Sequence, residues 1–470
     1  MAAAGAGGLL LVGAHLWAQT PAPGSSTGFP GLTTAPESET MPRLLQGSNG
    51  QVLRLWQRST GPDERGGGSV LLALAEPQGA WRALGEIRPS DAGVSARDPE
   101  LAVDASGKLA LVYRWWREQP RSKQIRLARS DDGGKSWTLS PTSIDSSGKA
   151  FDPRVSWVRG QGLVVVWSDE RRSSRSFDIY ARRSPDGGQT WEDERLLSQF
   201  PKTLSTEVHA RPQMISDGQD RLWTVWVGLR HGRTALYLNR STDGGRSWST
   251  PELLSGESRS LLGYSLVRAG EHLVLVWQDA RTGHNRVYST SSSDAGLSWT
   301  QPERVDHLPV NAALDAINPA IALVEPGGEV LVAWQDGRNG RSDIFLARST
   351  DGGRTWGKED KRMDMDEPGT AVSAYPKLAV GKDGRVAIAW DDDRDGAEAV
   401  YLRLRSVGVQ SEWGPETRVT TPAPKSAARL PQLIWGPDLS LYLAWEVWEE
   451  AFGGVGVKRV AGTVVRPDHR

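Results

Sequence analysis

The chain has 470 residues, with 56 basic and 57 acidic side chains, 52 glycines and no cysteine. The balanced charge argues against nucleic acid or an anionic membrane as the partner, and the lack of cysteine excludes disulfides and thiolate metal sites. Beyond the amino terminus, no stretch is long and apolar enough to cross a bilayer.

The amino terminus begins with an apolar stretch at residues 5–18, GAGGLLLVGAHLWA. We expect residues 1–18 to be a signal peptide cleaved near Ala18, and residues 19–40, rich in Pro, Ser and Thr, to be a flexible tether. The alternative is a disordered or mis-started amino terminus. The first interpretation predicts a secreted or periplasmic protein.

One phrase of eight residues, S-x-D-x-G-x-[ST]-W, recurs five times. The copies are Ser130–Trp137, Ser184–Trp191, Ser241–Trp248, Ser292–Trp299 and Ser349–Trp356. Recurrence at about fifty residues indicates a radial or solenoidal array. Within each copy the Asp can accept backbone hydrogen bonds, the Gly allows a positive φ, and the Trp can pack between sheets. The phrase therefore predicts a turn between two strands.

A second Trp series ends apolar runs, at Trp56, Trp115, Trp167, Trp226, Trp277, Trp334, Trp390 and Trp445. Each unit then contains a Pro-led strand, the strand ending in Trp, a third strand, and a fourth after the repeated phrase. We predict an all-β propeller of four-stranded blades, as one domain over residues 41–470. Eight blades are favoured. Seven is the alternative, because the phrase series, extended to Trp81 and Trp413, has seven members.

The five phrases resemble the Asp box, or BNR repeat, of the sialidase superfamily of β-propellers. The resemblance covers nearly everything after residue 40, although the closed sialidases have six blades. It implies that the boxes lie on the face away from the ligand site. The loops of the other face follow the Trp-ended strands and lead into the Pro-led strands.

Four loops of that face share the phrase W-x-D-x-R. Its charged pairs are Asp169 with Arg171, Asp279 with Arg281, Asp336 with Arg338, and Asp392 with Arg394. Residues that recur in successive blades usually hold blades together, and this is the preferred interpretation. The alternative is a ring of Asp and Arg that binds an acidic or hydroxyl-rich ligand.

Unrepeated residues at the same end are the better candidates for ligand binding. They are Arg97, Arg211, Arg230, His231 and Arg429. The loop with Arg230 and His231 keeps the Arg of the phrase but lacks its Asp. Arg97, Arg211 and Arg429 lead into Pro-led strands. We expect an exported platform that binds a glycan or another surface polymer, or a protein, as a monomer.

The alternative function is an exo-sialidase-like glycoside hydrolase. The resemblance implies three Arg, an Asp acid/base and a Tyr nucleophile activated by Glu. Tyr264, Asp98 and Glu449, or Glu450 in place of Glu449, are the nearest matches. The set does not assemble from the sequence, because two full boxes follow Tyr264 where a sialidase would be near its end.

Asp391, Asp393 and Asp395 open like a calcium loop, D-x-D-x-D-G, but Leu402 stands where the closing Glu belongs. The same residues align with WQDGRNG of the preceding unit. We therefore expect no cofactor, with calcium as a weaker alternative.

Overall fold

The computed structural model describes residues 37–466, except 48–49, 61–67, 77–80, 92, 174–175, 200–207, 310–311, 326–327, 408–411, 424 and 451–455. The predicted signal peptide and residues 19–36 lie outside the described residues. Strand β1 begins at Glu37, so the last four residues of the predicted tether belong to a strand. In the described ranges, no helix is long and apolar enough to cross a membrane.

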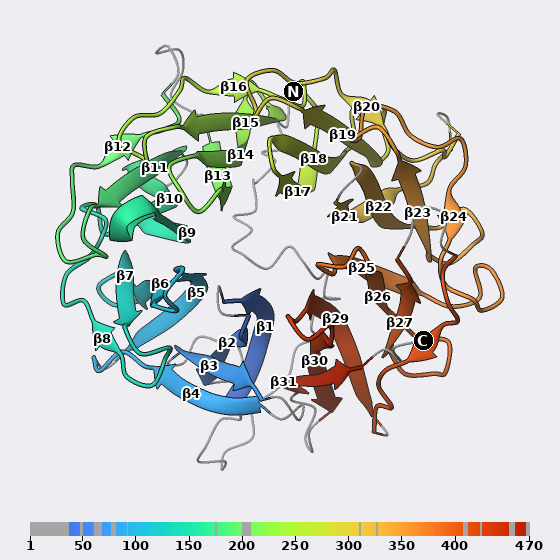
Figure 1. Cartoon of the computed structure of the whole chain (residues 1–470), viewed down its shortest axis with the longest axis horizontal. Coiled ribbons are helices and arrows are strands. Elements are labelled where there is room, and N and C mark those ends of the chain that lie inside the picture. Colours follow the sequence, from blue (N-terminus) through green and yellow to red (C-terminus); the bar gives the residue numbers. More distant parts are fainter. Residues whose placement is uncertain are drawn as a thin grey trace, which may run out of the picture. The chain divides into compact units, whose positions relative to one another are not determined.

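The described chain is all-β, and its strands pair in chain order as antiparallel sheets, which we number from the amino terminus (Figure 1). Sheet 1 contains β1 (Glu37–Gln46), β2 (Val52–Thr60), β3 (Gly68–Ala75) and β4 (Trp81–Ile87). Sheet 2 contains β5 (Val94–Val103), β6 (Leu109–Arg117), β7 (Ser122–Ser130) and β8 (Thr138–Leu139). Sheet 3 contains β9 (Ala150–Val158), β10 (Gly162–Ser173), β11 (Ser176–Ser184) and β12 (Arg195–Leu196), with a 3-10 turn at Arg159–Gln161.

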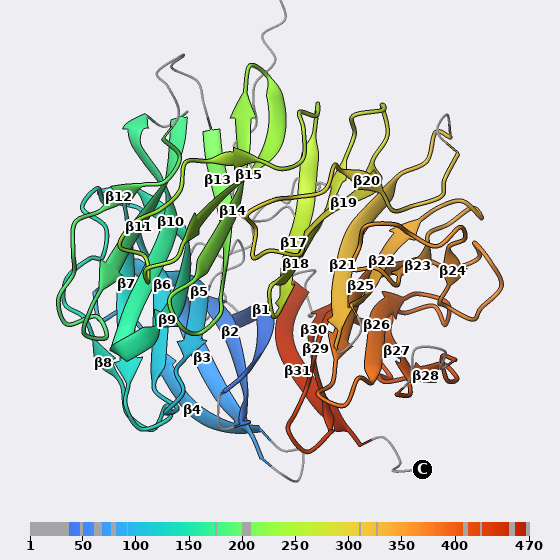
Figure 2. The same cartoon turned by 45° about the horizontal axis from the view of Figure 1, so that its top comes forward.

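The later sheets repeat this order, and their strands run side by side in the turned view (Figure 2). Sheet 4 contains β13 (Val208–Ser216), β14 (Leu222–Arg230), β15 (Arg233–Ser241) and β16 (Glu252–Leu253). Sheet 5 contains β17 (Leu261–Ala269), β18 (His272–Asp279), β19 (Arg286–Ser292) and β20 (Glu303–Arg304). Sheet 6 contains β21 (Ala316–Val324), β22 (Glu329–Asp336), β23 (Asp343–Ser349) and β24 (Lys361–Arg362).

Sheet 7 contains β25 (Ser373–Val380), β26 (Val386–Asp392), β27 (Ala399–Arg405) and β28 (Thr417–Arg418). Sheet 8 contains β29 (Ser426–Trp435), β30 (Leu441–Glu450) and β31 (Gly456–Val465), and no fourth strand within the described ranges. Phe177 and Val208 form one parallel pair that joins sheets 3 and 4.

The hydrophobic core is divided into layers, each between two successive sheets. Sheets 1 and 8 share a smaller layer that contains Trp56, Trp81 and Val460. The backbone N–H of Met41 also donates to Glu446 Oε1 of sheet 8, at 2.8 Å. Period-two strands bury apolar side chains on both faces in this arrangement, which explains the continuous apolar runs of the sequence.

The Asp boxes fold as predicted. In the last one, Asp351 Oδ1 accepts the Thr355 backbone N–H at 3.0 Å, and Asp351 Oδ2 accepts the Thr355 hydroxyl at 2.6 Å. Gly353, the Gly of the phrase, has φ of +81°, which a side chain would strain. Trp356 donates its indole N–H to Ser289 Oγ of the preceding sheet, at 2.9 Å. The box thus shapes a turn and joins two sheets.

The prediction that Trp115 is the sheet 2 member of the Trp series is wrong. Leu109 pairs with the box residue Ser130, as Leu163 pairs with Ser184. Counting from these pairs puts Tyr113, not Trp115, at the position that Trp167 holds in sheet 3. A buried Tyr fills the same place between sheets, which a search for Trp alone could not detect.

Candidate ligand-binding site

A β-bulge interrupts the first strand of every sheet at one place. The residues there with positive φ are Met41, Asp98, Asp152, Arg211, Gly263, Asn318, Tyr375 and Leu430. All except Gly263 precede a proline, which lacks an N–H and is tolerated at a bulge. The bulges therefore place eight equivalent residues, seven of them with a side chain, along the first strands.

Polar side chains of the second strands hold most of these bulges in place. The backbone N–H of Asp98 donates to Gln57, that of Asn318 to Gln278, and that of Tyr375 to Gln335. Glu446 accepts in the same way from Met41, and Asp391 from Leu430. Each acceptor directly follows the Trp of the preceding sheet's second strand. These contacts join neighbouring sheets.

Sheets 2, 3 and 4 break this rule. Arg114, Ser168 and Val227 occupy the position that Gln, Asp or Glu holds in the other five sheets. Charged bulge residues, Asp98, Asp152 and Arg211, lie in the same three sheets. A repeat that loses its structural residue and gains charge is a candidate functional site.

The charged groups of sheets 2–4 form one cluster. Arg114 Nε lies 2.9 Å from Asp98 Oδ2, and these two side chains are 17% and 12% exposed. Asp152 interacts electrostatically with Asp98 and with Arg114, Arg154 and Arg211. Asp152, Arg154 and Arg211 are half-buried. Two carboxylates and three guanidinium groups therefore lie near enough to influence one another at the bulges, and each keeps part of its surface exposed; we call them the Asp/Arg cluster.

Burial, and next the Asp98 carboxylate, raises the pKa of Asp152, although Arg154, Arg114 and Arg211 oppose the shift. A carboxyl that keeps its proton beside an ionised partner can donate a hydrogen bond or act as a general acid. The cluster thus contains a carboxyl group with a raised pKa beside three cationic side chains.

A second layer of charge supports the cluster. Glu100 forms an ion pair with Arg43 of sheet 1 and lies 4.0 Å from Arg154 NH1 of sheet 3. The corresponding first-strand positions of sheets 5 and 6 are Ser265 and Ala320. At this position sheets 1–3 therefore carry charged residues and sheets 5 and 6 carry small neutral ones, while sheet 7 carries Lys377.

Tyr264 lies next to the cluster, but its hydroxyl donates to the backbone carbonyls of Arg211 and Val225, the second at 3.2 Å. Burial raises its pKa, and Arg154 and Arg211 oppose the shift only in part. Glu449 belongs to β30 in sheet 8, whereas Tyr264 belongs to β17 in sheet 5. The structure brings Arg211 and Tyr264 together, with Asp98 linked to both only through Asp152, and does not pair Tyr264 with Glu449.

Of the remaining predicted residues, Arg97 lies beside the cluster and the other three lie elsewhere in sheets 4 and 8. The Arg97 guanidinium is 4.4 Å from the Trp116 ring centre, beside the cluster. Arg230 ends β14, and the exposed His231 forms the tip of the β14–β15 hairpin. Arg429 forms an ion pair with Glu398 and lies 5.0 Å from the Trp448 ring centre, in sheets 7 and 8.

The W-x-D-x-R residues contact one another and the preceding sheet. Asp336 is buried and accepts the indole N–H of Trp334 at 2.8 Å and Arg338 NH2 at 2.7 Å. Arg338 also binds Asp360, which accepts the His307 backbone N–H of the loop that leaves sheet 5. Arg171 with Glu194, and Arg394 with Glu416, repeat this contact. These contacts agree with the structural interpretation.

Sheet 4 has Gly228 in place of the repeated Asp. Trp226 there donates its indole N–H to His209 Nδ1, at 3.3 Å, and His209 is fully buried. A Cβ at residue 228 would approach His209 Nδ1 to 2.8 Å. The imidazole therefore replaces the missing carboxylate, which explains the broken phrase without a ligand.

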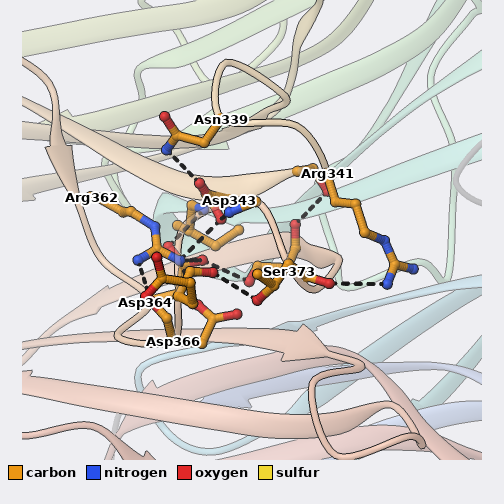
Figure 3. A network of polar contacts seen from close by, with 12 residues as sticks. Asn339, Arg341, Asp343, Arg362, Asp364, Asp366 and Ser373 are labelled. Atoms are coloured by element: carbon orange, nitrogen blue, oxygen red, sulfur yellow. Dashed lines mark hydrogen bonds and ion pairs between the residues drawn. The ribbon is translucent and has the colours of Figure 1, made fainter.

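Three carboxylates of sheet 6, Asp343, Asp364 and Asp366, come within metal-ligand distance of one another. Figure 3 shows Arg362 pointing into this group, and its NH2 lies 3.1, 3.0 and 2.5 Å from the three. Burial, and next Asp343, raises the pKa of Asp364 to about 7. The guanidinium supplies the positive charge that a cation would bring.

The three residues of the calcium-like phrase bind different partners. Asp391 accepts from the Leu430 backbone, Asp393 from Arg341 at 2.8 Å, and Asp395 from the Tyr401 hydroxyl at 2.6 Å. Burial, and next Glu398, raises the pKa of Asp391 well above its usual range. The carboxylates do not converge on one point.

Sequence reasoning missed Arg114, Asp152 and Arg154. A usable signal exists, because Asp precedes the Pro in two successive units, at Asp98 and Asp152, while other residues precede it elsewhere. The change at Arg114 was hidden because the Trp series was assigned to Trp115.

Comparison with known proteins identifies a family of BNR-repeat proteins. The sequence signature described as "BNR repeat-like domain" matches residues 154–388, half of the 470 residues. A Neosartorya fischeri protein named "Probable oligoxyloglucan-reducing end-specific xyloglucanase" is 26% identical over 252 residues, covering 50% of this chain and 27% of the relative. A Micromonospora viridifaciens sialidase is 24% identical over 307 residues, covering 57% of this chain and 44% of the relative.

The chain therefore matches less than half the length of these curated relatives. Among solved structures, the NanB sialidase from Streptococcus pneumoniae aligns at 10% identity and a TM-score of 0.40, covering 92% of each chain.

Proposed function

Since the chain belongs to the BNR repeat-like family, with the fold of the sialidase superfamily, we propose that it binds a glycan at the Asp/Arg cluster of sheets 2–4. The observation that carries the proposal is the ion pair of Arg114 with Asp98, together with Asp152, which interacts electrostatically with Asp98, Arg114, Arg154 and Arg211. Guanidinium groups hold carboxylates in planar pairs, and Asp side chains accept hydrogen bonds from sugar hydroxyls.

Arg97 lies at the edge of this site, and we assign it to ligand binding as well. Arg230 and His231 lie at the β14–β15 hairpin of sheet 4, and Arg429 belongs to sheet 8. They remain proposed contacts for an extended ligand. Secretion or export to the periplasm stays a prediction.

Hydrolysis of a glycosidic bond is the second candidate function. The raised pKa of Asp152 beside Asp98 supports it, because glycosidases use a protonated and an ionised carboxyl together. The printed names of the curated relatives, a xyloglucanase and a sialidase, agree with this chemistry. The hydroxyl of Tyr264 donates to backbone carbonyls, so Asp98 and Asp152 are the better catalytic candidates.

We further propose that the eight sheets are the blades of one closed propeller. The contact of Met41 with Glu446 and the layer shared by sheets 1 and 8 support closure. A closed ring would hold the first strands in fixed positions around the site.

The test is an array of sialylated, uronic-acid and neutral glycans, together with a fluorogenic sialoside assay. We expect Arg154→Ala and Arg211→Ala to lower affinity for the bound class by about ten-fold or more. Arg246→Ala, in an exposed box turn, is the matched control and should have no effect. Unchanged affinity in both cluster variants would remove the proposal. Turnover lost in Asp152→Asn with binding retained would establish hydrolysis.

A further inference from the structure

Aromatic side chains continue from the Asp/Arg cluster along sheets 2 and 3. Trp116 lies two residues after Arg114 on β6, so both side chains point to the same face of the sheet. The Trp116 ring is half-buried. Its ring centre lies 4.4 Å from the Arg97 guanidinium.

Sheet 3 contributes two more rings. Phe151 directly precedes Asp152 on β9, and its ring packs edge-on against Phe177, with centroids 5.2 Å apart. Both rings are half-buried. Lys123 pairs with Trp116 across β6 and β7, and its Nζ lies 5.2 Å from the Phe151 ring centre. Trp116 and Phe151 are therefore neighbours through Lys123.

Positive charge surrounds these rings. Arg97 stacks on Trp116, and the side chains of Lys123 and Arg121 are 14% and 68% exposed. Glu170 lies 2.5 Å from Lys123 Nζ and 3.9 Å from Arg121 NH2. One carboxylate thus faces two cations, and Arg97 adds a third.

We propose that Trp116, Phe151 and Phe177 form a second subsite, which binds the next sugar ring of an acidic saccharide chain whose first ring is held at the Asp/Arg cluster. The inference rests on the proposed glycan binding and adds the ligand class: a chain of uronic acids, not a single terminal sugar. The C–H face of a pyranose packs on an aromatic ring, and its carboxylate pairs with Arg or Lys. A neutral chain would leave these cations without a carboxylate partner, and a single sugar held at the Asp/Arg cluster would leave the second subsite empty.

The test is calorimetric titration of the full chain with galacturonic acid and with its six-unit oligomer. Trp116→Ala should weaken binding of the oligomer about ten-fold, the size expected for one lost aromatic contact, and leave the monomer unchanged. Trp116→Phe should restore most of the loss. Leu297→Ala, an exposed apolar residue of an Asp box, is the control and should bind both probes normally.

Arg154→Ala separates the two proposals, because it should weaken both probes. If Arg154→Ala weakens both and Trp116→Ala weakens neither, or both equally, the second subsite is wrong while the cluster stands. If Arg154→Ala changes neither, the glycan site itself is wrong. Binding of neither probe by the unaltered chain would overturn the acidic-chain assignment. Phe177→Ala serves as the second variant if Trp116→Ala does not fold.

Discussion

Arg405 of sheet 7 and Glu329 of sheet 6 form a buried bidentate ion pair, with hydrogen bonds of 2.9 and 2.6 Å. Arg405 pairs with Val386, just as the box residue Ser349 pairs with Val330. Sheet 7 lacks a full box, and the ion pair takes the place where its box would begin. In sheet 7, a salt bridge to the neighbouring sheet therefore takes the position at which the box Ser stands in sheet 6.

Removing one partner of this buried ion pair should lower the stability of the fold. Arg405→Ala leaves the Glu329 carboxylate buried with only Arg348 beside it, and we expect the free energy of unfolding to fall by about 3 kcal/mol. Arg341→Ala removes a solvent-exposed ion pair and should cost about 1 kcal/mol or less. Urea unfolding of both variants gives the comparison. Equal losses would show that the buried pair has no special role.

Trp356→Ala should lower the free energy of unfolding by about 3 to 5 kcal/mol. The indole packs in the layer between sheets 5 and 6 and donates to Ser289, and the substitution removes both contacts. Lys358→Ala, an exposed neighbour, is the control. Thermal unfolding close to that of the unaltered protein would show that the box Trp does not join the sheets.

Asp336→Ala tests the W-x-D-x-R phrase. Asp336 is buried among Trp334 and Arg338, so we expect the free energy of unfolding to fall by about 3 kcal/mol. Glycan affinity of the folded variant should not change. Loss of affinity without loss of stability would restore the alternative of a ligand-binding Asp/Arg ring.

The boxes should make stability depend on acid pH. Burial of Asp351 would raise its pKa, but hydrogen bonds from Thr355 and Ser349 outweigh this and lower it to about 2, and the pKa of Asp186 is likewise lowered to about 2. A lowered pKa stabilises the folded state above pH 3.8, the ordinary value, and this stability is lost as pH falls toward 2. Urea unfolding between pH 5 and 2.5 should show a shallower decline for Asp351→Asn. An unchanged slope would contradict the shift.

Tyr264→Phe removes a buried hydroxyl that donates to two backbone carbonyls. We expect the free energy of unfolding to fall by about 1 to 2 kcal/mol, and glycan affinity and turnover to stay unchanged. This differs from the expectation for a phenolic nucleophile, whose loss would remove most of the rate while stability persisted. Measuring both quantities on one preparation decides between them.

The sequence by itself determined the architecture. The eight-residue box and the apolar runs that end in Trp recur locally, and local turn chemistry and period-two burial are enough to predict four short strands per unit. The degenerate units were harder to predict from the sequence. Tyr113 stands where other sheets have the strand-ending Trp, and Arg405 stands where they have the box Ser.

The tertiary structure decided the site. Arg114, Asp152, Arg154 and Arg211 come from three sheets and more than ninety residues of sequence, and only the register of the bulges makes them neighbours. Their charges matter because the side chains are half-buried together, where carboxylates and guanidinium groups shift each other's protonation. Sequence spacing carries no information on such contacts between sheets. The sequence therefore identified Asp98, Arg211 and Tyr264 only as separate candidates. Their arrangement, and the role of the Tyr264 hydroxyl as a donor to the backbone, became visible only in the fold.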